Sequence, residues 1–122
     1  DLLPYLDAAN IDLKSFSDDI YQRVSGGHLQ PVLDTILAMK QAGVWVEITN
    51  LVIPGINDDM DMIRQMCQWL VAHGLADAPL HFSRFFPRYK MHDLQPTPVH
   101  TLRAAQQIAE QEGVRHVYLG NV

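Results

Sequence analysis

The stretch "GGHLQPVLDTILAMKQAGVWVEITNLVIPG", residues 26–55, predicts a helix that is followed directly by a strand. Leu33 and Ile36 recur at helical spacing, and a glycine follows the end of this periodic segment. The β-branched run that comes next stops at Pro54-Gly55, a dipeptide that is typical of turns. One helix-to-strand unit is therefore expected here.

The same alternation extends in both directions along the chain. Strands separated by helices of this length imply right-handed βαβ units and a parallel sheet. We therefore expect an α/β fold of about four parallel strands with helices on one face. Asn57 or Asp58 is the expected N-cap of the second helix and Thr97 that of the third, with Pro98 at its first position. The other expected elements are strands within residues 8–16, 79–85 and 114–120 and helices within 57–74 and 98–112.

Polar residues interrupt the predicted strands in a regular way. Strands of a parallel sheet are normally covered on both faces and almost entirely apolar. Polar side chains that repeat on one face predict a sheet curled around a polar lumen, as in a partial barrel, with sites at the carboxyl ends of the strands. Three groups of polar residues share a face in this way: Asn10, Asp12 and Lys14; Glu47 and Thr49; His81 and Ser83.

Four positions at these strand ends are candidates for ligand binding, and each has a plainer interpretation. Asp12 and Lys14, expected to be buried, form either a structural salt bridge or a site in which the carboxylate accepts ribose hydroxyls and the ammonium meets a carboxylate or phosphate. The main chain beside Ile53 is either an ordinary strand end or a flat surface for a planar ring, which Gly55 lets approach. His81 is either a core histidine or a ligand.

Composition limits the class of protein. The chain has 122 residues, of which 48% are hydrophobic, and a net charge of −5, which argues against nucleic acid or an anionic membrane as the main partner. No apolar stretch approaches the ~20 residues of a membrane span. The single cysteine, Cys67, excludes an internal disulfide and an all-cysteine metal site within the chain, and it indicates a cytoplasmic protein. Both ends look cut, so residues 1–122 are expected to be one fragment of a larger domain.

Taken in order, several stretches resemble one family, and the likeness extends over essentially the whole chain. The family is the radical S-adenosylmethionine (SAM) enzymes of the pyruvate formate-lyase activating enzyme type, whose second half is the part resembled. More narrowly, the chain is similar to the radical SAM protein of the AmmeMemoRadiSam system. The stretches that carry the resemblance include "NIDLKSF" (10–16), "GVWVEITNLVIPGIND" (43–58), "HFSRFFPRYKM" (81–91) and "VYLGNV" (117–122).

The resemblance implies the C-terminal portion of a partial (βα)6 TIM-like barrel that holds SAM and a [4Fe-4S] cluster in its lumen. It implies that Asp12 binds the SAM ribose and Lys14 the ribose or the methionyl carboxylate. It also implies that Ile53 offers main-chain contact to the adenine and that His81 reaches the ribose or adenine. No residue of this chain is implied to be a metal ligand or a catalytic group. The C-x-x-x-C-x-x-C cluster motif and the glycine-rich "GGEP" strand end are not in this sequence and are expected upstream of Asp1.

In the whole enzyme, the resemblance implies reductive cleavage of SAM to a 5′-deoxyadenosyl radical that abstracts hydrogen from a protein or small-molecule substrate, with a glycyl-radical enzyme as one possible partner. The fragment alone is expected to be inactive. Two alternatives stay open at this point. One is a non-catalytic nucleoside-binding α/β module. The other is an ordinary (βα) barrel enzyme that uses Glu47 and His81 as acid and base.

Overall fold

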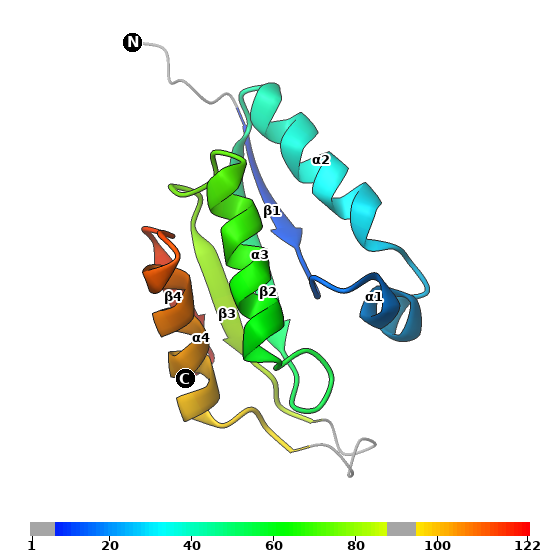
Figure 1. The fold of residues 1–122 in the computed structure, drawn as a ribbon, viewed down its shortest axis with the longest axis vertical. Coiled ribbons are helices and arrows are strands. Elements are labelled where there is room, and N and C mark those ends of the chain that lie inside the picture. The colour runs from blue at the N-terminus through cyan, green and yellow to red at the C-terminus, as the bar shows by residue number, and fades with distance from the viewer. Residues whose placement is uncertain (1–6, 88–94) are drawn as a thin grey trace.

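The computed structural model describes residues 7–87 and 95–122, which form a four-stranded parallel sheet in the order β1-β2-β3-β4 with helices on one face (Figure 1). The predicted α/β class, with four parallel strands and helices on one side, is confirmed. Part of the stretch 81–91 lies outside the described residues. The strands are β1 (Ala8–Asp12), β2 (Trp45–Val52), β3 (Leu80–Arg84) and β4 (Val117–Gly120). The helices are α1 (Asp18–Ser25), α2 (Leu29–Gln41), α3 (Met60–Ala72) and α4 (Val99–Gln111).

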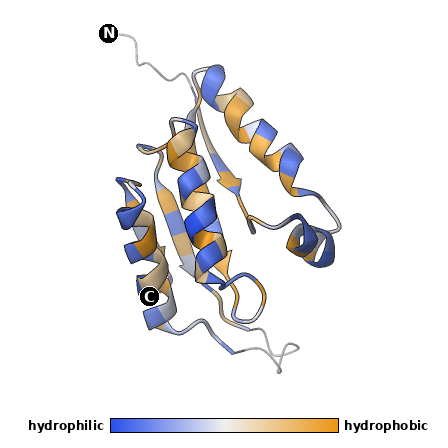
Figure 2. Ribbon diagram, in the orientation of Figure 1, coloured by the Kyte–Doolittle hydropathy of each residue, from blue (hydrophilic) through white to orange (hydrophobic). Residues whose placement is uncertain are grey.

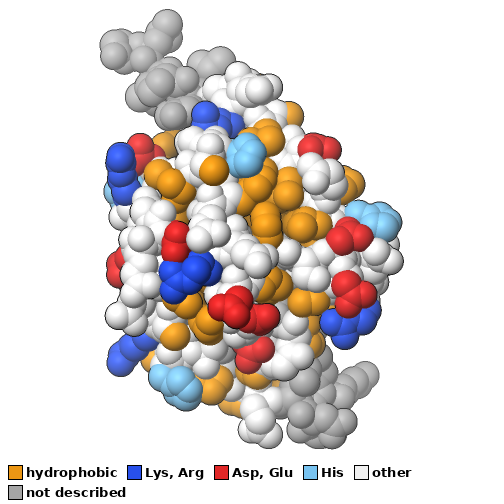
Figure 3. Space-filling view, viewed as in Figure 1, with side chains coloured by type: hydrophobic (Ala, Val, Ile, Leu, Met, Phe, Trp, Pro, Cys, Tyr) orange, Lys and Arg blue, Asp and Glu red, His pale blue; other side chains and the backbone are white. Residues whose placement is uncertain are grey.

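The hydrophobic core lies between the sheet and the helices. Alternate residues of β2 point into it, and Ile48 there is fully buried together with Leu80 and Phe82 of β3. In Figure 2 the outward side of α3 is largely hydrophilic, because its apolar stripe faces the sheet. The stripe predicted from helical spacing is confirmed, and its members are Ile63, Met66, Cys67 and Leu70. Figure 3 shows further hydrophobic side chains gathered between α2 and α3 on this side of the molecule.

The predicted N-caps of the last two helices are wrong. Asp59, not Asn57 or Asp58, caps α3, and its side chain accepts from the Asp61 backbone N–H at 2.9 Å. Pro98 rather than Thr97 occupies the N-cap of α4. Both Asn57 and Thr97 are buried, and their side chains bond to backbone groups at strand ends, which outcompetes capping.

Helix α1 was not predicted. Ser17 caps it by accepting from the Ile20 N–H at 3.3 Å, two aspartates occupy its first turn, and Gly26 ends it with φ 71°. Asp18 of this first turn also accepts a hydrogen bond at 2.9 Å from the backbone N–H of Leu29, the first residue of α2. The carboxylate of one helix thus completes the start of the next, whose own N-cap, His28, makes no side-chain cap bond.

Candidate functional site

The side of the sheet opposite the helices carries a row of side chains that crosses all four strands. In the register of the sheet, Asp12 pairs with Thr49, Thr49 with His81, and His81 with Tyr118. Two residues earlier on the same face, Asn10 pairs with Glu47, and the Thr49 hydroxyl donates to the Asn10 side chain at 2.8 Å. The shared face predicted for these polar residues is confirmed. We call this side the open face.

Glu47 and His81 form the best-defined polar contact of the open face. His81 Nε2 lies 2.8 Å from Glu47 Oε1, and the Trp45 indole N–H donates to Glu47 Oε2 at 3.2 Å. The His81 ring stacks on Tyr118 with ring centroids 5.2 Å apart. The hydrogen bond with His81, and then that from Trp45, lower the pKa of Glu47 below its ordinary value. The imidazole is therefore held in place on two sides beside an ionised carboxylate.

Asp12 and Lys14 are not buried, which corrects the expectation from the sequence. Their side chains are 71% and 45% exposed, with Lys14 Nζ 3.9 Å from Asp12 Oδ2. The reason is that no helix among the described residues covers the open face. An exposed ion pair of this kind contributes about 1 kcal/mol or less to stability. A structural salt bridge here would therefore add little to the stability of the fold. Both side chains are accessible to a ligand.

The Lys14 peptide is fixed more firmly than its side chain. The Lys14 N–H donates to the Tyr21 hydroxyl oxygen at 2.8 Å, and the Lys14 carbonyl accepts from Asn57 Nδ2 at 2.7 Å. Tyr21 belongs to α1 and is buried, which raises the pKa of its hydroxyl. Tyr21 and Asn57, which were not predicted as site residues, thus fix the position of the Lys14 backbone.

The main chain of Ile53 is hydrogen-bonded within its own turn. Its N–H donates to Asn57 Oδ1 at 2.6 Å, and its carbonyl accepts from the backbone N–H groups of Ile56 and Asn57 at 3.1 and 3.2 Å. Gly55 has φ 76°, and a Cβ there would meet nothing within 4 Å. A planar group can therefore approach this turn closely and pack against the surface of the turn, but it would not receive a hydrogen bond from the Ile53 N–H.

Lys14 and Ile53 meet in a pocket of about 240 Å³ at the carboxyl end of the sheet. Its walls are mostly apolar, and Lys14 is the one charged residue among the described residues that line it. Asp12 and His81 are not among its lining residues and lie on the open face, so the structure brings two of the four candidates into one hollow. The lining residues are Lys14, Ile20, Val24, Leu51, Ile53, Ile56 and Asn57.

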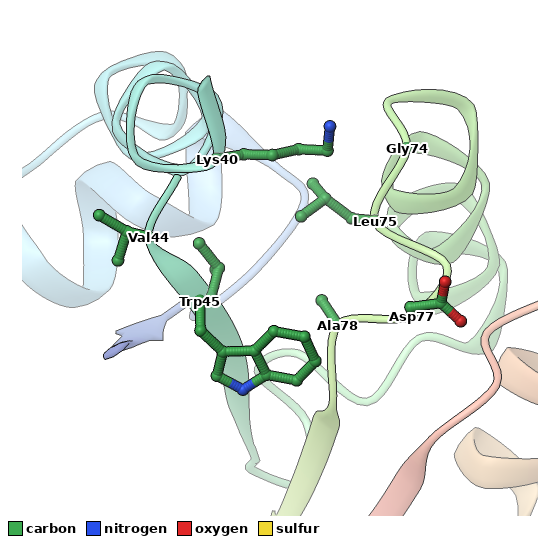
Figure 4. A pocket seen from close by; sticks show the side chains of 8 residues that line it. Lys40, Val44, Trp45, Gly74, Leu75, Asp77 and Ala78 are labelled. Carbon is green, nitrogen blue, oxygen red and sulfur yellow. The ribbon is translucent and has the colours of Figure 1, made fainter. Parts of the chain in front are cut away.

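A second pocket, of about 170 Å³, lies at the opposite end of the strands (Figure 4). Figure 4 shows Lys40 reaching across its mouth toward Gly74, with Trp45 beneath. Its carboxylate, Asp77, is already bonded by Arg115 at 2.9 Å. Since ligands of open α/β sheets bind outside the carboxyl ends of the strands, the pocket at Lys14 is the better candidate.

The chain does not fit an iron–sulfur cluster. Its one cysteine, Cys67, is fully buried in the core, and burial raises the pKa of its thiol to about 12. Across residues 7–87 and 95–122 no group of three or more histidine, cysteine or acidic residues could hold a metal ion. Within the same ranges no helix is both long and apolar enough to span a membrane.

The chain is similar to known proteins both in sequence and in fold. No protein-family model matches the chain. The chain is 44% identical over 117 residues to the uncharacterized protein MJ0808 of Methanocaldococcus jannaschii, a match that covers 96% of this chain and 35% of that protein. The chain thus spans about a third of the length of this relative.

The fold is similar to that of a solved structure. That structure is a domain of pyruvate-formate lyase-activating enzyme from Bacteroides vulgatus, with a TM-score of 0.77 and 20% identity. The match covers 94% of this chain and 68% of that domain. The class defined by fold is therefore a barrel-like α/β fold similar to that of an activating-enzyme domain.

Proposed function

We propose that this chain is the nucleoside-binding part of a radical SAM enzyme of the pyruvate formate-lyase activating enzyme type. The observation that carries the proposal is the pocket at the carboxyl end of the sheet, where the Lys14 ammonium stands beside apolar walls and next to Asp12. The similarity of fold to an activating-enzyme domain supports it. The ordered sequence motifs support the narrower proposal that the protein resembles the radical SAM component of the AmmeMemoRadiSam system.

Each site residue has a role that its chemistry allows. In this proposal the Asp12 carboxylate accepts the ribose hydroxyls, and the Lys14 ammonium binds the methionyl carboxylate. The adenine lies against the apolar wall and the turn at Ile53, and His81, oriented by Glu47, approaches from the open face. Bound SAM would supply the deoxyadenosyl group that abstracts hydrogen from a substrate, after one electron from a reduced cluster outside this chain has released methionine, and these residues would bind and orient it.

The nature of the whole protein is a separate proposal. We propose that residues 1–122 are one fragment of a larger cytoplasmic protein whose other part holds the [4Fe-4S] cluster. Its substrate is a small molecule or a protein, with a glycyl-radical enzyme as one partner of the second kind. Because one buried thiol cannot hold a four-iron cluster, this chain alone should gain no cluster absorbance after anaerobic incubation with iron and sulfide.

Calorimetric titration of SAM into the full-length, cluster-loaded protein tests the proposal. Asp12→Ala and Lys14→Ala should each weaken SAM binding by about 1–3 kcal/mol, because each removes a charged partner of the ligand. Both variants should keep their iron. Asp19→Ala is the matched control, since Asp19 is also an exposed carboxylate in a surface ion pair, with Arg23 at 3.3 Å. Unchanged SAM affinity in both site variants would contradict the proposal.

A second function has one specific observation in its favour. The 2.8 Å contact between Glu47 and His81, with the pKa of Glu47 lowered, is the arrangement of an oriented acid–base pair. An ordinary barrel enzyme of this kind would lose turnover with His81→Gln and keep it with Asp12→Ala, and it would bind no SAM. A non-catalytic nucleoside module would bind SAM without forming 5′-deoxyadenosine in the full-length protein.

A further inference from the structure

We propose that Asn57 and Tyr21 are positioning residues of the nucleoside pocket, which clamp the Lys14 peptide so that its side chain is presented to the ligand. The inference rests on the proposed function. It concerns two buried side chains that are not expected to touch the ligand's polar groups, and it assigns them an effect on binding rather than on folding alone.

The Asn57 side chain uses both of its amide hydrogens and its oxygen. Nδ2 donates to the carbonyls of Lys14 and Leu51 at 2.7 and 2.8 Å, and Oδ1 accepts from the Ile53 N–H at 2.6 Å. The residue is 3% exposed, so these bonds have little competition from water. The three residues whose backbone groups it binds, Lys14, Leu51 and Ile53, all line the pocket.

The bonds to Lys14 lie beyond the end of the β1–β2 ladder. The β1–β2 register ends at the pair Asp12 and Thr49, and the Leu13 N–H makes one more backbone bond, to the Thr49 carbonyl at 2.9 Å. Beyond that point, the Lys14 carbonyl is held by Asn57 and the Lys14 N–H by Tyr21. The Asn57 and Tyr21 side chains therefore keep the backbone ordered beyond the end of the β1–β2 ladder, as far as Lys14, the residue that faces the ligand.

Fixing the peptide matters because the Lys14 side chain itself is loosely held. Its only ion-pair contact among the described residues is the exposed one with Asp12 at 3.9 Å. A long side chain that starts from a fixed peptide loses less conformational freedom when it meets a carboxylate than one that starts from a mobile loop. The clamp thus lowers the entropic cost of binding at this residue.

Thr97 provides a matched control for buried polar residues that tie strand ends. It is fully buried, its hydroxyl donates to the Val52 carbonyl at 2.6 Å, and it accepts from the Phe85 N–H at 3.0 Å. Neither of its partners lines the pocket. Thr97→Val keeps the shape of the side chain and removes its hydrogen bonds, so it reports what a purely structural tie contributes.

The experiment measures SAM affinity by calorimetry in the full-length, cluster-loaded protein, corrected for the folded fraction, beside urea unfolding. Asn57→Asp keeps the size of the side chain but sets a carboxylate against two carbonyls. It should weaken SAM binding about tenfold or more, and Tyr21→Phe should weaken it several-fold. Thr97→Val should lower the unfolding midpoint and leave SAM affinity unchanged. In ligand-free protein, amide exchange at Lys14 should rise with Tyr21→Phe, which removes the acceptor of the Lys14 N–H, and should stay constant with Thr97→Val.

Each outcome decides between the two proposals. Wild-type protein that binds no SAM overturns the proposed function and this inference with it. Wild-type protein that binds SAM, with Asn57→Asp and Tyr21→Phe binding equally well per folded molecule, overturns the inference alone. If Asn57→Asp does not fold, Tyr21→Phe decides the matter, because Tyr21 binds the other backbone group of Lys14: unchanged affinity rejects the clamp, and weaker affinity supports it.

Discussion

The two faces of the sheet are built from neighbouring residues of the same strands, and they differ in almost every property. On the helix-covered face, Ile48, Leu80 and Phe82 are fully buried and pack in the core. On the open face, Thr49 and His81, each next in sequence to one of them, are partly exposed and hydrogen-bonded to polar side chains. A slip of one residue in register would exchange the two sets. The core therefore fixes the register that aligns the candidate site.

The largest expected difference between the faces is in stability. Phe82→Ala should cost about 3–5 kcal/mol of unfolding free energy, because it leaves a cavity in the core. Tyr118→Ala, on the open face and 51% exposed in the wild type, should cost less than about 1 kcal/mol. Urea unfolding of both variants measures the contrast. Equal losses would mean that the open face is as stabilising as the core.

A smaller, pH-dependent effect is expected from Glu47. Its pKa is lowered in the folded protein, chiefly by His81, so the pair stabilises the fold above the ordinary pKa of 4.5 and loses that contribution as pH falls through the folded value. Because the side chains are about one-third exposed, Glu47→Gln should cost less than about 1 kcal/mol at pH 7. The difference from the wild type should vanish in acid.

Urea titrations at several pH values measure this difference, and Glu110→Gln, on an exposed position of α4, is the control. A stability gap between Glu47→Gln and the wild type that stays constant between pH 7 and pH 3 would contradict the role of the charge.

The smallest effect should be at the one thiol, which lies on the helix-covered side. Cys67 is fully buried, so an alkylating reagent cannot reach its thiol. The pKa of the thiol is raised to about 12, so the reactive thiolate does not form near neutral pH. We expect no reaction with iodoacetamide at pH 8 in the native protein and one label per chain in urea. Rapid native labelling, read by mass spectrometry, would show that the covered face opens.

Local patterns predicted the fold well. The buried stripe of α3 follows from helical spacing, and the order of strands and helices follows from the alternation of periods, both of which involve residues close in sequence. The shared polar face of Asn10, Glu47 and His81 could also be predicted, since side chains alternate along any strand.

Contacts between distant parts of the chain could not be predicted in this way. Asn57 bonds to a carbonyl 43 residues earlier and Thr97 to one 45 residues earlier, so local rules assigned both to helix caps. The exposure of Asp12 and Lys14 depends on what covers the open face, which the pattern of one strand does not encode. Helix α1 had a usable sign in the sequence: Ser17 followed by two aspartates.

The bond from Asp18 to the start of α2 makes two helices depend on one carboxylate. The hydrogen bonds from Leu29, Gln22 and His28 lower the pKa of Asp18, so it stays ionised in this role at neutral pH. If α1 opens, α2 loses the acceptor for its first N–H, and the two helices should therefore lose structure as one cooperative unit. Ile20 and Val24 of α1 form a wall of the pocket. That wall should therefore stay formed only as long as α1 stays folded together with α2, the helix that packs on β2.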